Sequence, residues 1–453
     1  MCSKILIKQA LHLIDNWLDF QTYIKEIPGV AVGISVEDET VFKREYGYAD
    51  LENKIKLNGW HLFRIASHSK LFTATAIMKL YHEGKLSIDD RVSKYLPWFA
   101  SEKDKNLQDI RIFHLLTHSS GITADGNTAH WITYKFPSIE EIKEQVIEGI
   151  SYFKVSEIHK YSNFGYTLLG QIIENVSGLS YHAYIKKEIL EPLKMNKTVT
   201  DVNESNITKH AIGYGVKYPG KERDKLEHAP AKVMCPATGL SSTVEDLIKF
   251  YQAHFLGNNI LFPDYIKREM QRTQFKSKGV DRGLGFAIAN LPDIQLVGHG
   301  GTYPGFATQS QFIQDKKMIV VVLINAIDAQ PGSVLKGIIN ILLFVTKQKG
   351  KLLAKPDKQM QDLKDLVGFY KSDWGVGLFS QIGSKLVLTA PGADNPAGSL
   401  TTLEHIEGYK FTVPKEPASV KSGQVIDFID GPDGEKIYVD NHGGKRKKFK
   451  FSY

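Results

Sequence analysis

Apolar and polar positions alternate along the chain with two different periods. In residues 1–20 apolar side chains recur every three or four positions with charges between them, which predicts an amphipathic helix. Residues 29–36 and 40–47 flank an acidic turn and predict a β-hairpin, and residues 308–313 and 318–325 predict a second strand pair. The pattern therefore predicts an α+β fold with strands from both ends of this region.

A run of small and apolar residues follows Ser67. From Leu71 to Leu80 these residues recur at helical spacing, and no Pro or Gly occurs before Gly84. The run predicts a buried helix that Ser67 opens.

The last quarter of the chain has another pattern. The segment from Lys347 to Lys358 is rich in Lys and Gln, which predicts a linker. Residues 359–453 form short alternating segments separated by Gly and Pro turns, which predict a separate small β-barrel. The interpretation is two domains, residues 1–350 and residues 359–453.

Composition excludes several classes of protein. The 453 residues are 42% hydrophobic, enough for large cores, yet no apolar run reaches the ~18–20 residues of a membrane span. The first helix lacks the apolar core of a signal peptide, and two cysteines, Cys2 and Cys235, provide no disulfide framework. We expect a cytoplasmic protein without a membrane partner.

Charge adds little to this picture. The net charge of +7 is modest, and part of the excess lies in residues 445–450. An edge strand protected by lysines explains that cluster better than a nucleic-acid patch, so no nucleic-acid partner is expected.

Ser67 and Lys70 are the first candidates for chemistry. Residues three apart on a helix lie about 5–6 Å apart at Cβ, so the amine can reach the hydroxyl, as a nucleophile and its base require. A lysine with a pKa near ~10.4 must lose its proton to act as a base, and burial at a helix N-terminus favours this loss.

The spacing alone is weak, because Ser-x-x-Lys also occurs at Ser151/Lys154 and Ser333/Lys336. Ser151 lies in a strand-like stretch, which would point the two side chains to opposite faces. Ser333 follows Pro331-Gly332 and resembles a helix cap. Only Ser67 precedes a helix of small residues.

Two further motifs stand out. Tyr161 precedes Asn163 by two positions ahead of a helical run, although a buried tyrosine beside a capped turn would explain the pair equally well. The glycines of His299-Gly300-Gly301 would let a substrate backbone lie against a strand. His-Gly-Gly recurs at residues 442–444, so the tripeptide alone is not specific.

Two other patterns favour structure over chemistry. His114 and His118 lie four apart, which would suit a metal, but a zinc site needs three or four protein ligands and no third is evident. Hydrogen-bonded structural histidines and no metal or other cofactor are expected. Ser242 and Glu245 have the spacing of a capping box ahead of a helix.

Together, Ser67/Lys70, Tyr161/Asn163 and His299-Gly300-Gly301 occur in the order of the serine β-lactamase and penicillin-binding-protein superfamily, which the chain resembles over residues 20–345. The most similar branch is the class C β-lactamase-related hydrolases, which include esterases and D-amino-acid peptidases. The resemblance implies an antiparallel sheet with helices on both faces, a helical lobe, and an active-site cleft between sheet and lobe. The C-terminal barrel resembles appended lipocalin-like domains, which narrow the entrance to the active site or build a homo-oligomer.

The resemblance also implies roles. Ser67 would be the acylated nucleophile and Lys70 its base, while Tyr161 would exchange protons with the lysine, so that their pKa values belong to the pair. Asn163 would contact the substrate. The oxyanion would lie between the backbone N–H groups of Ser67 and Thr302, which is often the largest catalytic contribution.

His299 departs from the pattern of true β-lactamases, which usually carry a lysine there. A histidine with a pKa near ~6.5 is mostly neutral at pH 7 and attracts a substrate carboxylate weakly. Hydrolysis of a small ester or peptide substrate is therefore the preferred interpretation. The alternatives are a β-lactamase or DD-carboxypeptidase, and a penicillin-binding sensor or scaffold without turnover.

Overall fold

The computed structural model describes residues 2–276, 279–353, 363–373, 375–414, 422–432, 434–440 and 444–452. The chain forms two compact units: Pro28–Pro331, and Met1–Ile27 together with Gly332–Tyr453. Compact units need not coincide with folding domains, so the division at residues 350 and 359 stays a prediction. Among the described residues, no helix has both the length and the apolar content to cross a membrane.

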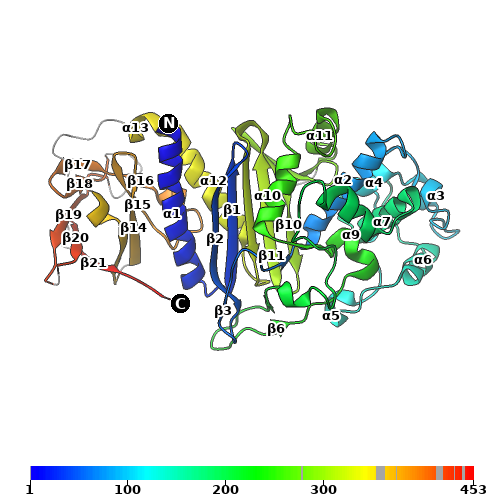
Figure 1. The fold of residues 1–453 in the computed structure, drawn as a ribbon, viewed down its shortest axis with the longest axis horizontal. Helices are drawn as coiled ribbons and strands as arrows, with labels where there is room; N and C mark the ends of the chain where they lie inside the picture. Colours follow the sequence, from blue (N-terminus) through cyan, green and yellow to red (C-terminus); the bar gives the residue numbers. More distant parts are fainter. Residues whose placement is uncertain are drawn as a thin grey trace. The chain divides into compact units, whose positions relative to one another are not determined.

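The unit Pro28–Pro331 is built on an antiparallel sheet (Figure 1). Its strands, in spatial order, are β3 (Ile55–Lys56), β2 (Glu39–Asp50), β1 (Gly29–Val36), β12 (Met318–Ile324), β11 (Phe306–Ile313), β10 (Ile294–Tyr303), β9 (Ala287–Leu291) and β8 (Asp281–Arg282). Both predicted strand pairs are present. Because β1 pairs with β12, the two ends of the unit meet in the middle of the sheet.

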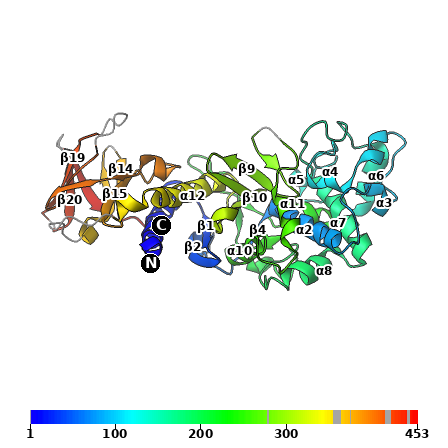
Figure 2. The same ribbon diagram turned by 90° about the horizontal axis from the view of Figure 1, so that it is seen from above.

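Helices and two small ribbons complete this unit (Figure 2). The helices and helical turns are η1 (Ala66–His68), α2 (Ser69–His82), α3 (Val92–Tyr95), η2 (Lys105–Asp109), α4 (Ile112–Leu116), α5 (His130–Thr133), α6 (Ile139–Glu148), α7 (Asn163–Ser177), α8 (Tyr181–Ile185), η3 (Lys186–Leu190), η4 (Ile207–Lys209), η5 (Lys232–Met234), α9 (Cys235–Thr238), α10 (Val244–Ala253), α11 (Asp264–Gln271) and η6 (Gln314–Lys316). The ribbons pair β4 (Phe63–Arg64) with β7 (Ser241–Ser242) and β5 (Gly213–Tyr214) with β6 (Lys225–Leu226).

Close packing fixes two of these helices. Helix α10 lies so near β1 that a Cβ on Gly33 would meet Val244 Cγ1 at 2.2 Å. Helix α2 is buried almost throughout, as the run of small residues predicts, and it ends just before Gly84, whose φ is +69°. The buried start of α2 carries the candidate chemistry.

The other unit combines the first helix with the C-terminal part of the chain. Its elements are α1 (Cys2–Ile24), α12 (Pro331–Lys347), α13 (Lys349–Leu352), η7 (Leu363–Leu366), β13 (Gly368–Ser372), β14 (Gly375–Ile382), β15 (Lys385–Thr389), η8 (Pro396–Ser399), β16 (Thr401–Thr402), β17 (Glu404–Glu407), β18 (Lys410–Thr412), β19 (Val425–Asp430), β20 (Lys436–Asp440) and β21 (Lys445–Phe449). The predicted amphipathic helix is α1. Its Trp17 donates to Ala393 O at 3.2 Å, and its Phe20 stacks on Phe369 at 5.4 Å.

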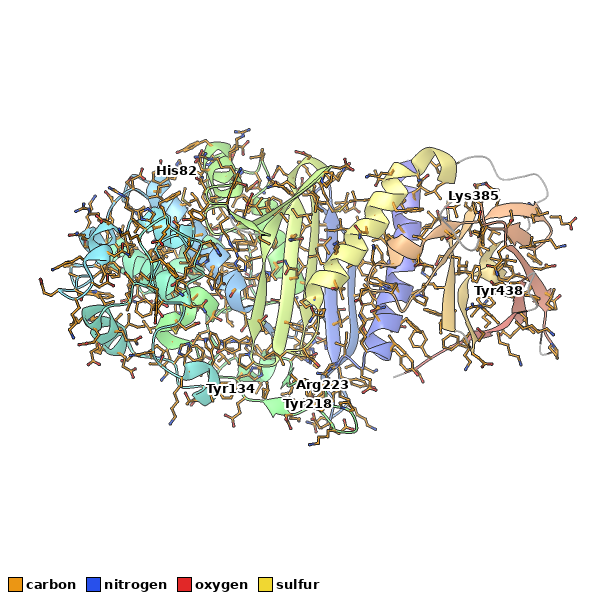
Figure 3. The ribbon with its side chains drawn as sticks, turned by 180° about the vertical axis from the view of Figure 1, so that it is seen from behind. His82, Tyr134, Tyr218, Arg223, Lys385 and Tyr438 are labelled. Atoms are coloured by element: carbon orange, nitrogen blue, oxygen red, sulfur yellow. The ribbon has the colours of Figure 1, made fainter. Side chains whose placement is uncertain are left out.

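Strands β13 to β21 make the predicted small barrel, which is antiparallel and nearly closed. Its interior is filled by aromatic and aliphatic side chains, and Tyr438 packs edge-on against Phe379 at 5.6 Å (Figure 3). The basic strand β21 lies between β13 and β20, so its prediction as an edge strand was wrong. Strand pairing involves the backbone, and exposed side chains on a solvated barrel face permit lysines on an inner strand. Residues 354–358 of the predicted linker, residues 359–362 of the predicted barrel, and His442-Gly443 lie outside the described residues.

Candidate active site

Ser67 follows a tightly held backbone turn. Strand β4 pairs with β7, and Ile65 N donates to Leu240 O at 3.0 Å. Ala66 then has a φ of +49°, a strained value for a residue with a side chain, and the chain enters the short turn η1 before α2. Ser67 is therefore partly exposed at the start of a helix whose next residues are buried.

Lys70 lies one turn further on and is completely buried. Its Nζ lies 2.6 Å from Asn163 Oδ1, 2.8 Å from Ala237 O and 3.2 Å from Ser67 Oγ. Burial lowers the pKa of Lys70 well below its ordinary value; Asp125 opposes this shift and Arg282 adds to it. In its neutral form the amine has two N–H groups and one lone pair, so with the N–H groups on the two carbonyl oxygens the lone pair would face the Ser67 hydroxyl.

Tyr161 and Asn163 come from the start of α7. Ser162 Oγ caps this helix by accepting from Gly165 N at 2.8 Å, which fixes the residues on either side. Lys70 Nζ lies 4.8 Å from the Tyr161 ring centroid. Burial raises the pKa of Tyr161, against the effect of a hydrogen bond with Ser67, so the phenol keeps its proton at neutral pH.

Strand β10 brings the glycine motif beside the nucleophile. A Cβ on Gly301 would lie 2.3 Å from Ile65 O and 3.1 Å from Ala66 Cβ, so the strand backbone directly contacts the turn before Ser67. Gly300 faces the side chain of Gln309, and Thr302 is exposed. The structure thus brings together every residue of the three motifs.

His299 is buried next to these residues. Its Nδ1 lies 2.5 Å from Gly300 O, and its Nε2 has no hydrogen-bond partner within the described part of the chain. Burial, and then the charges of Arg282 and Lys70, lower the pKa of His299 well below its ordinary value. The ring is therefore neutral at pH 7, as the sequence predicts.

The sequence did not indicate two charged residues of the site, Asp125 and Arg282. Asp125 Oδ1 accepts from Asn163 Nδ2 at 2.6 Å. The guanidinium carbon of Arg282 lies 5.8 Å from the Tyr161 ring centroid, and Arg282 Nε donates to His159 Nε2 at 3.0 Å. Neither residue belongs to a periodic pattern or a motif, so only the fold reveals them.

Comparison with known proteins identifies the family. Residues 18–336 match the family described as Beta-lactamase. The chain belongs to the beta-lactamase family. Over 332 residues it is 30% identical to Protein flp of Staphylococcus aureus strain MRSA252, covering 71% of this chain and 64% of that protein. Over 304 residues it is 30% identical to Penicillin-binding protein 4* of Bacillus subtilis strain 168, covering 62% of this chain and 65% of that protein. The chain thus spans a little under two thirds of the length of these curated relatives.

Two solved structures share the fold of this beta-lactamase family member. The octameric penicillin-binding protein homologue from Pyrococcus abyssi superposes with a TM-score of 0.64 at 24% identity, covering 96% of this chain and 100% of that one. The D-amino acid amidase from Ochrobactrum anthropi SV3, complexed with D-phenylalanine, superposes with a TM-score of 0.64 at 23% identity, covering 75% and 99%. At these identities the comparison shows the fold alone.

The other two Ser-x-x-Lys pairs lack this environment. Lys154 and Lys336 are exposed, and Ser151 Oγ accepts from Asn106 Nδ2 at 3.1 Å. Ser333 lies inside the first turn of α12, which begins at Pro331, so its prediction as a cap was wrong. Proline suits the first helical position because its missing N–H is not needed there, and this starts the helix earlier.

Three other predicted side chains have structural partners. His114 Nδ1 accepts from Arg111 N, and His118 Nδ1 from Ser162 N, both at 3.1 Å. These contacts agree with hydrogen-bonded structural histidines. The capping box predicted at Ser242 was wrong by one position, because Thr243 caps α10 and Ser242 pairs in β7.

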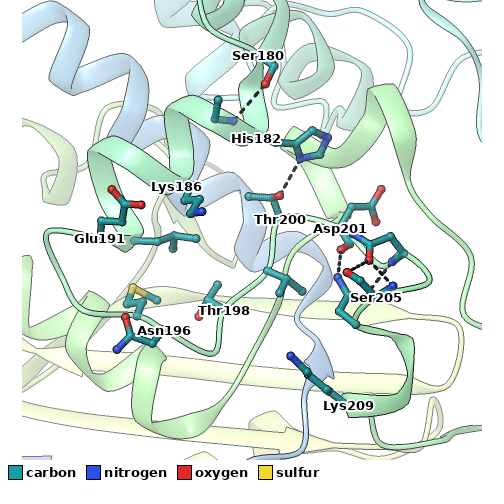
Figure 4. Close-up of a pocket in the computed structure, with 16 residues that line it drawn as sticks. Ser180, His182, Lys186, Glu191, Asn196, Thr198, Thr200, Asp201, Ser205 and Lys209 are labelled. Atoms are coloured by element: carbon teal, nitrogen blue, oxygen red, sulfur yellow. Dashed lines mark hydrogen bonds between the residues drawn. The ribbon is translucent and has the colours of Figure 1, made fainter.

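A polar cavity of about 690 Å³ lies around α8 and the segment 195–209 (Figure 4). His182 Nδ1 lies 2.8 Å from Thr200 Oγ1, and Ser205 Oγ donates to Asn203 Oδ1 at 2.6 Å. Its polar groups thus bond to one another, and it contains none of the residues of the three motifs.

Proposed function

We propose that the protein is a serine hydrolase that cleaves ester or amide bonds through an acyl-enzyme on Ser67. The observation that carries this proposal is the arrangement around Lys70, whose buried Nζ lies within hydrogen-bond distance of Ser67 Oγ and of the carbonyl oxygens of Asn163 and Ala237. In the neutral amine, N–H groups on the two carbonyl oxygens would leave the lone pair for Ser67. Membership of the beta-lactamase family supports the same reaction.

The reaction would proceed in two halves. Lys70 takes the Ser67 proton while Oγ bonds to the substrate carbonyl carbon, and the oxyanion lies between the N–H groups of Ser67 and Thr302. The carbon–heteroatom bond then breaks, and the leaving group takes a proton through Lys70 and Tyr161. Water attacks the acyl-enzyme in the second half and restores the Ser67 hydroxyl. The raised pKa of Tyr161 keeps the phenol protonated, so it would pass on its proton only while taking another from Lys70, and the lowered pKa of Lys70 suits a base.

The neutral His299 favours uncharged substrates. A fixed ammonium beside a partly desolvated carboxylate contributes roughly 1.5–3 kcal/mol, which a neutral imidazole does not supply. Short-chain esters and D-amino-acid amides are therefore the proposed substrates, and the fold shared with a D-amino acid amidase agrees with the amide class.

The test is the hydrolysis of p-nitrophenyl acetate and D-phenylalanine amide, with a fluorophosphonate probe and mass spectrometry of the labelled protein. Ser67→Ala should abolish turnover and labelling, while Ser151→Ala and Ser333→Ala should keep both. An adduct on another serine would refute the assignment. Stoichiometric acylation without turnover would instead support the alternative of a penicillin-binding sensor.

Arg282 favours a second candidate, a β-lactamase or DD-carboxypeptidase acting on carboxylate-bearing substrates. Among the described residues its guanidinium makes no ion pair, and the one hydrogen bond of its side chain goes to a histidine. An unpaired cation near Lys70 is electrostatically costly, and a substrate carboxylate would offset that cost. Nitrocefin and a D-alanyl-D-alanine peptide test this candidate against the neutral ester.

If the substrates are neutral, the parent protein should hydrolyse nitrocefin negligibly, and His299→Lys should hydrolyse it faster than the parent does. Comparable efficiency on nitrocefin and the ester would make the second candidate the better one. Loss of only the nitrocefin activity in Arg282→Gln would then assign the carboxylate to this residue.

We also propose that the protein forms a homo-oligomer, with the C-terminal lipocalin-like barrel as the contact. The shared fold with an octameric homologue supports this. Light scattering of the full chain should give a multiple of 50.9 kDa, and a monomer at all concentrations would refute it.

A further inference from the structure

Asp125 is held rigidly beside the start of α7. Its loop is tied to that helix, because Phe164 N donates to Ala124 O at 2.9 Å and Ser162 Oγ donates to Thr123 O at 2.7 Å. Gly126 N also donates to Thr123 Oγ1 at 3.1 Å. The backbone on both sides of Asp125 is thus fixed relative to Asn163, the first residue of the helix.

The carboxylate of Asp125 is ionised and well bonded. Its Oδ1 accepts from Asn163 Nδ2 at 2.6 Å and from Trp131 Nε1 at 3.0 Å, and His130 Nε2 lies 3.8 Å away. Partial burial acts to raise the pKa of Asp125, but the nearby His130 ring and the hydrogen bonds from Asn163 and Trp131 outweigh it and lower that pKa. The group is therefore a hydrogen-bond acceptor only.

An acceptor at this place determines how the Asn163 amide is turned. With its NH₂ toward Asp125, the amide presents Oδ1 to Lys70 at 2.6 Å. The reverse orientation would set the amide oxygen against the carboxylate, so that two acceptors would face each other. It would also turn the NH₂ toward Lys70. Asp125 thus selects one of the two amide orientations.

The amide orientation in turn determines where the Lys70 lone pair points. In the observed arrangement Asn163 Oδ1 and Ala237 O take both N–H groups of the neutral amine. If the amide turned its NH₂ to Lys70, the amine would have to accept from it, and the lone pair would face Asn163 and not Ser67. The base would then be in place but wrongly directed.

We propose that Asp125 is a positioning residue for the Ser67 reaction, acting through Asn163 to direct the lone pair of Lys70 at the nucleophile. The proposal rests on the proposed function, since it presumes that Lys70 is the base. Trp131 supports this role by donating a hydrogen bond to the carboxylate.

The negative charge of Asp125 predicts the direction in which the pH dependence of kcat/KM changes when Asp125 is replaced. The titratable or charged groups that face Lys70 are Asp125 before α5, Arg282 on β8, His118 after α4, Tyr161 before α7, Tyr166 on α7 and His299 on β10. Asp125 is the anion among them and favours the ammonium form of Lys70. Its removal lowers the pKa of Lys70, so the acidic limb of the kcat/KM profile moves to lower pH.

Asp125→Ala and Asp125→Asn test the proposal with p-nitrophenyl acetate. Asp125→Ala should lower kcat by roughly 10²-fold, the cost of a misdirected catalytic group, with KM little changed. Asp125→Asn keeps the shape and a carbonyl acceptor, so kcat should fall less while the acidic limb moves equally. If Asp125→Ala does not fold, the isosteric Asp125→Asn carries the test.

Asp104→Asn is the matched control, because this carboxylate accepts from the backbone of Ile150 and Ser151 at 3.0 and 2.8 Å and contacts neither Asn163 nor Lys70. It should lower the melting temperature without moving the limb. In an Asn163→Ala background, Asp125→Ala should lower kcat much less than it does alone, because the amide through which Asp125 acts on Lys70 is already absent. An unmoved limb, or fully multiplicative losses, would overturn the proposal. Activity in Ser67→Ala would instead overturn the proposed function.

Discussion

Replacing Gly301 by alanine tests how closely β10 must approach the nucleophile. The new Cβ would lie 2.3 Å from Ile65 O and 2.7 Å from Thr308 Oγ1. An ordinary contact begins at 3.4 Å, so the strand or the turn before Ser67 must move by about 1 Å. A misplacement of about 1 Å can cost about 10²-fold in rate, or about 2.7 kcal/mol of transition-state stabilisation. The loss should appear in kcat, because the Thr302 N–H would no longer reach the oxyanion.

Gly300→Ala is the matched control on the same strand. Its Cβ would meet Gln309 Oε1 at 2.5 Å, which is the far end of a flexible side chain and can turn away. Turnover of p-nitrophenyl acetate should therefore fall by less than about threefold in Gly300→Ala and by about 10²-fold in Gly301→Ala, with both proteins folded in thermal melts. If Gly301→Ala keeps the parent kcat, or if both variants lose equally, the argument from strand approach is wrong.

Two further predictions concern the base and the C-terminal region. Lys70→Ala and Tyr161→Phe should each lower kcat far more than they raise KM, and the double variant should be much less impaired than the product of the singles; fully multiplicative losses would show that the two do not act as one unit. A chain ending at Lys358 should stay folded and hydrolyse esters, although Trp17 and Phe20 on α1 lose contacts to residues 393 and 369 and its melting temperature should fall. Insoluble protein would show the barrel to be part of the folding core.

Residue spacing predicted much of the site. Ser67 in η1 and Lys70 in the first turn of α2 lie close together, as their spacing of three residues predicted, and the run of small residues indicated that the helix after Ser67 is buried. Alternating apolar positions predicted the hairpin of β1 and β2 and the pair of β11 and β12. These are local patterns, which a sequence displays directly.

Contacts between distant segments were not predictable in the same way. Asp125 lies in a polar loop and Arg282 on a two-residue strand, and neither place has a period or a motif. Strand β21 was predicted as an edge strand because its run of lysines is visible in the sequence. Its position between β13 and β20 depends on how all the strands of the barrel pair, which the sequence does not display. The grouping of α1 with the C-terminal elements also depends on tertiary packing.

These distant residues affect how the local motif works. Ser67 and Lys70 could lie on any buried helix, but burial alone leaves the direction of the amine lone pair free. Asn163 and Ala237 remove that freedom by accepting both N–H groups, and Asp125 keeps the Asn163 amide turned the right way. Burial lowers the pKa of Lys70, and Asp125 and Arg282 then shift it in opposite directions, so these distant residues adjust the pH at which the proposed base becomes available. A sequence motif therefore supplies the reacting groups, while the fold determines their protonation and direction.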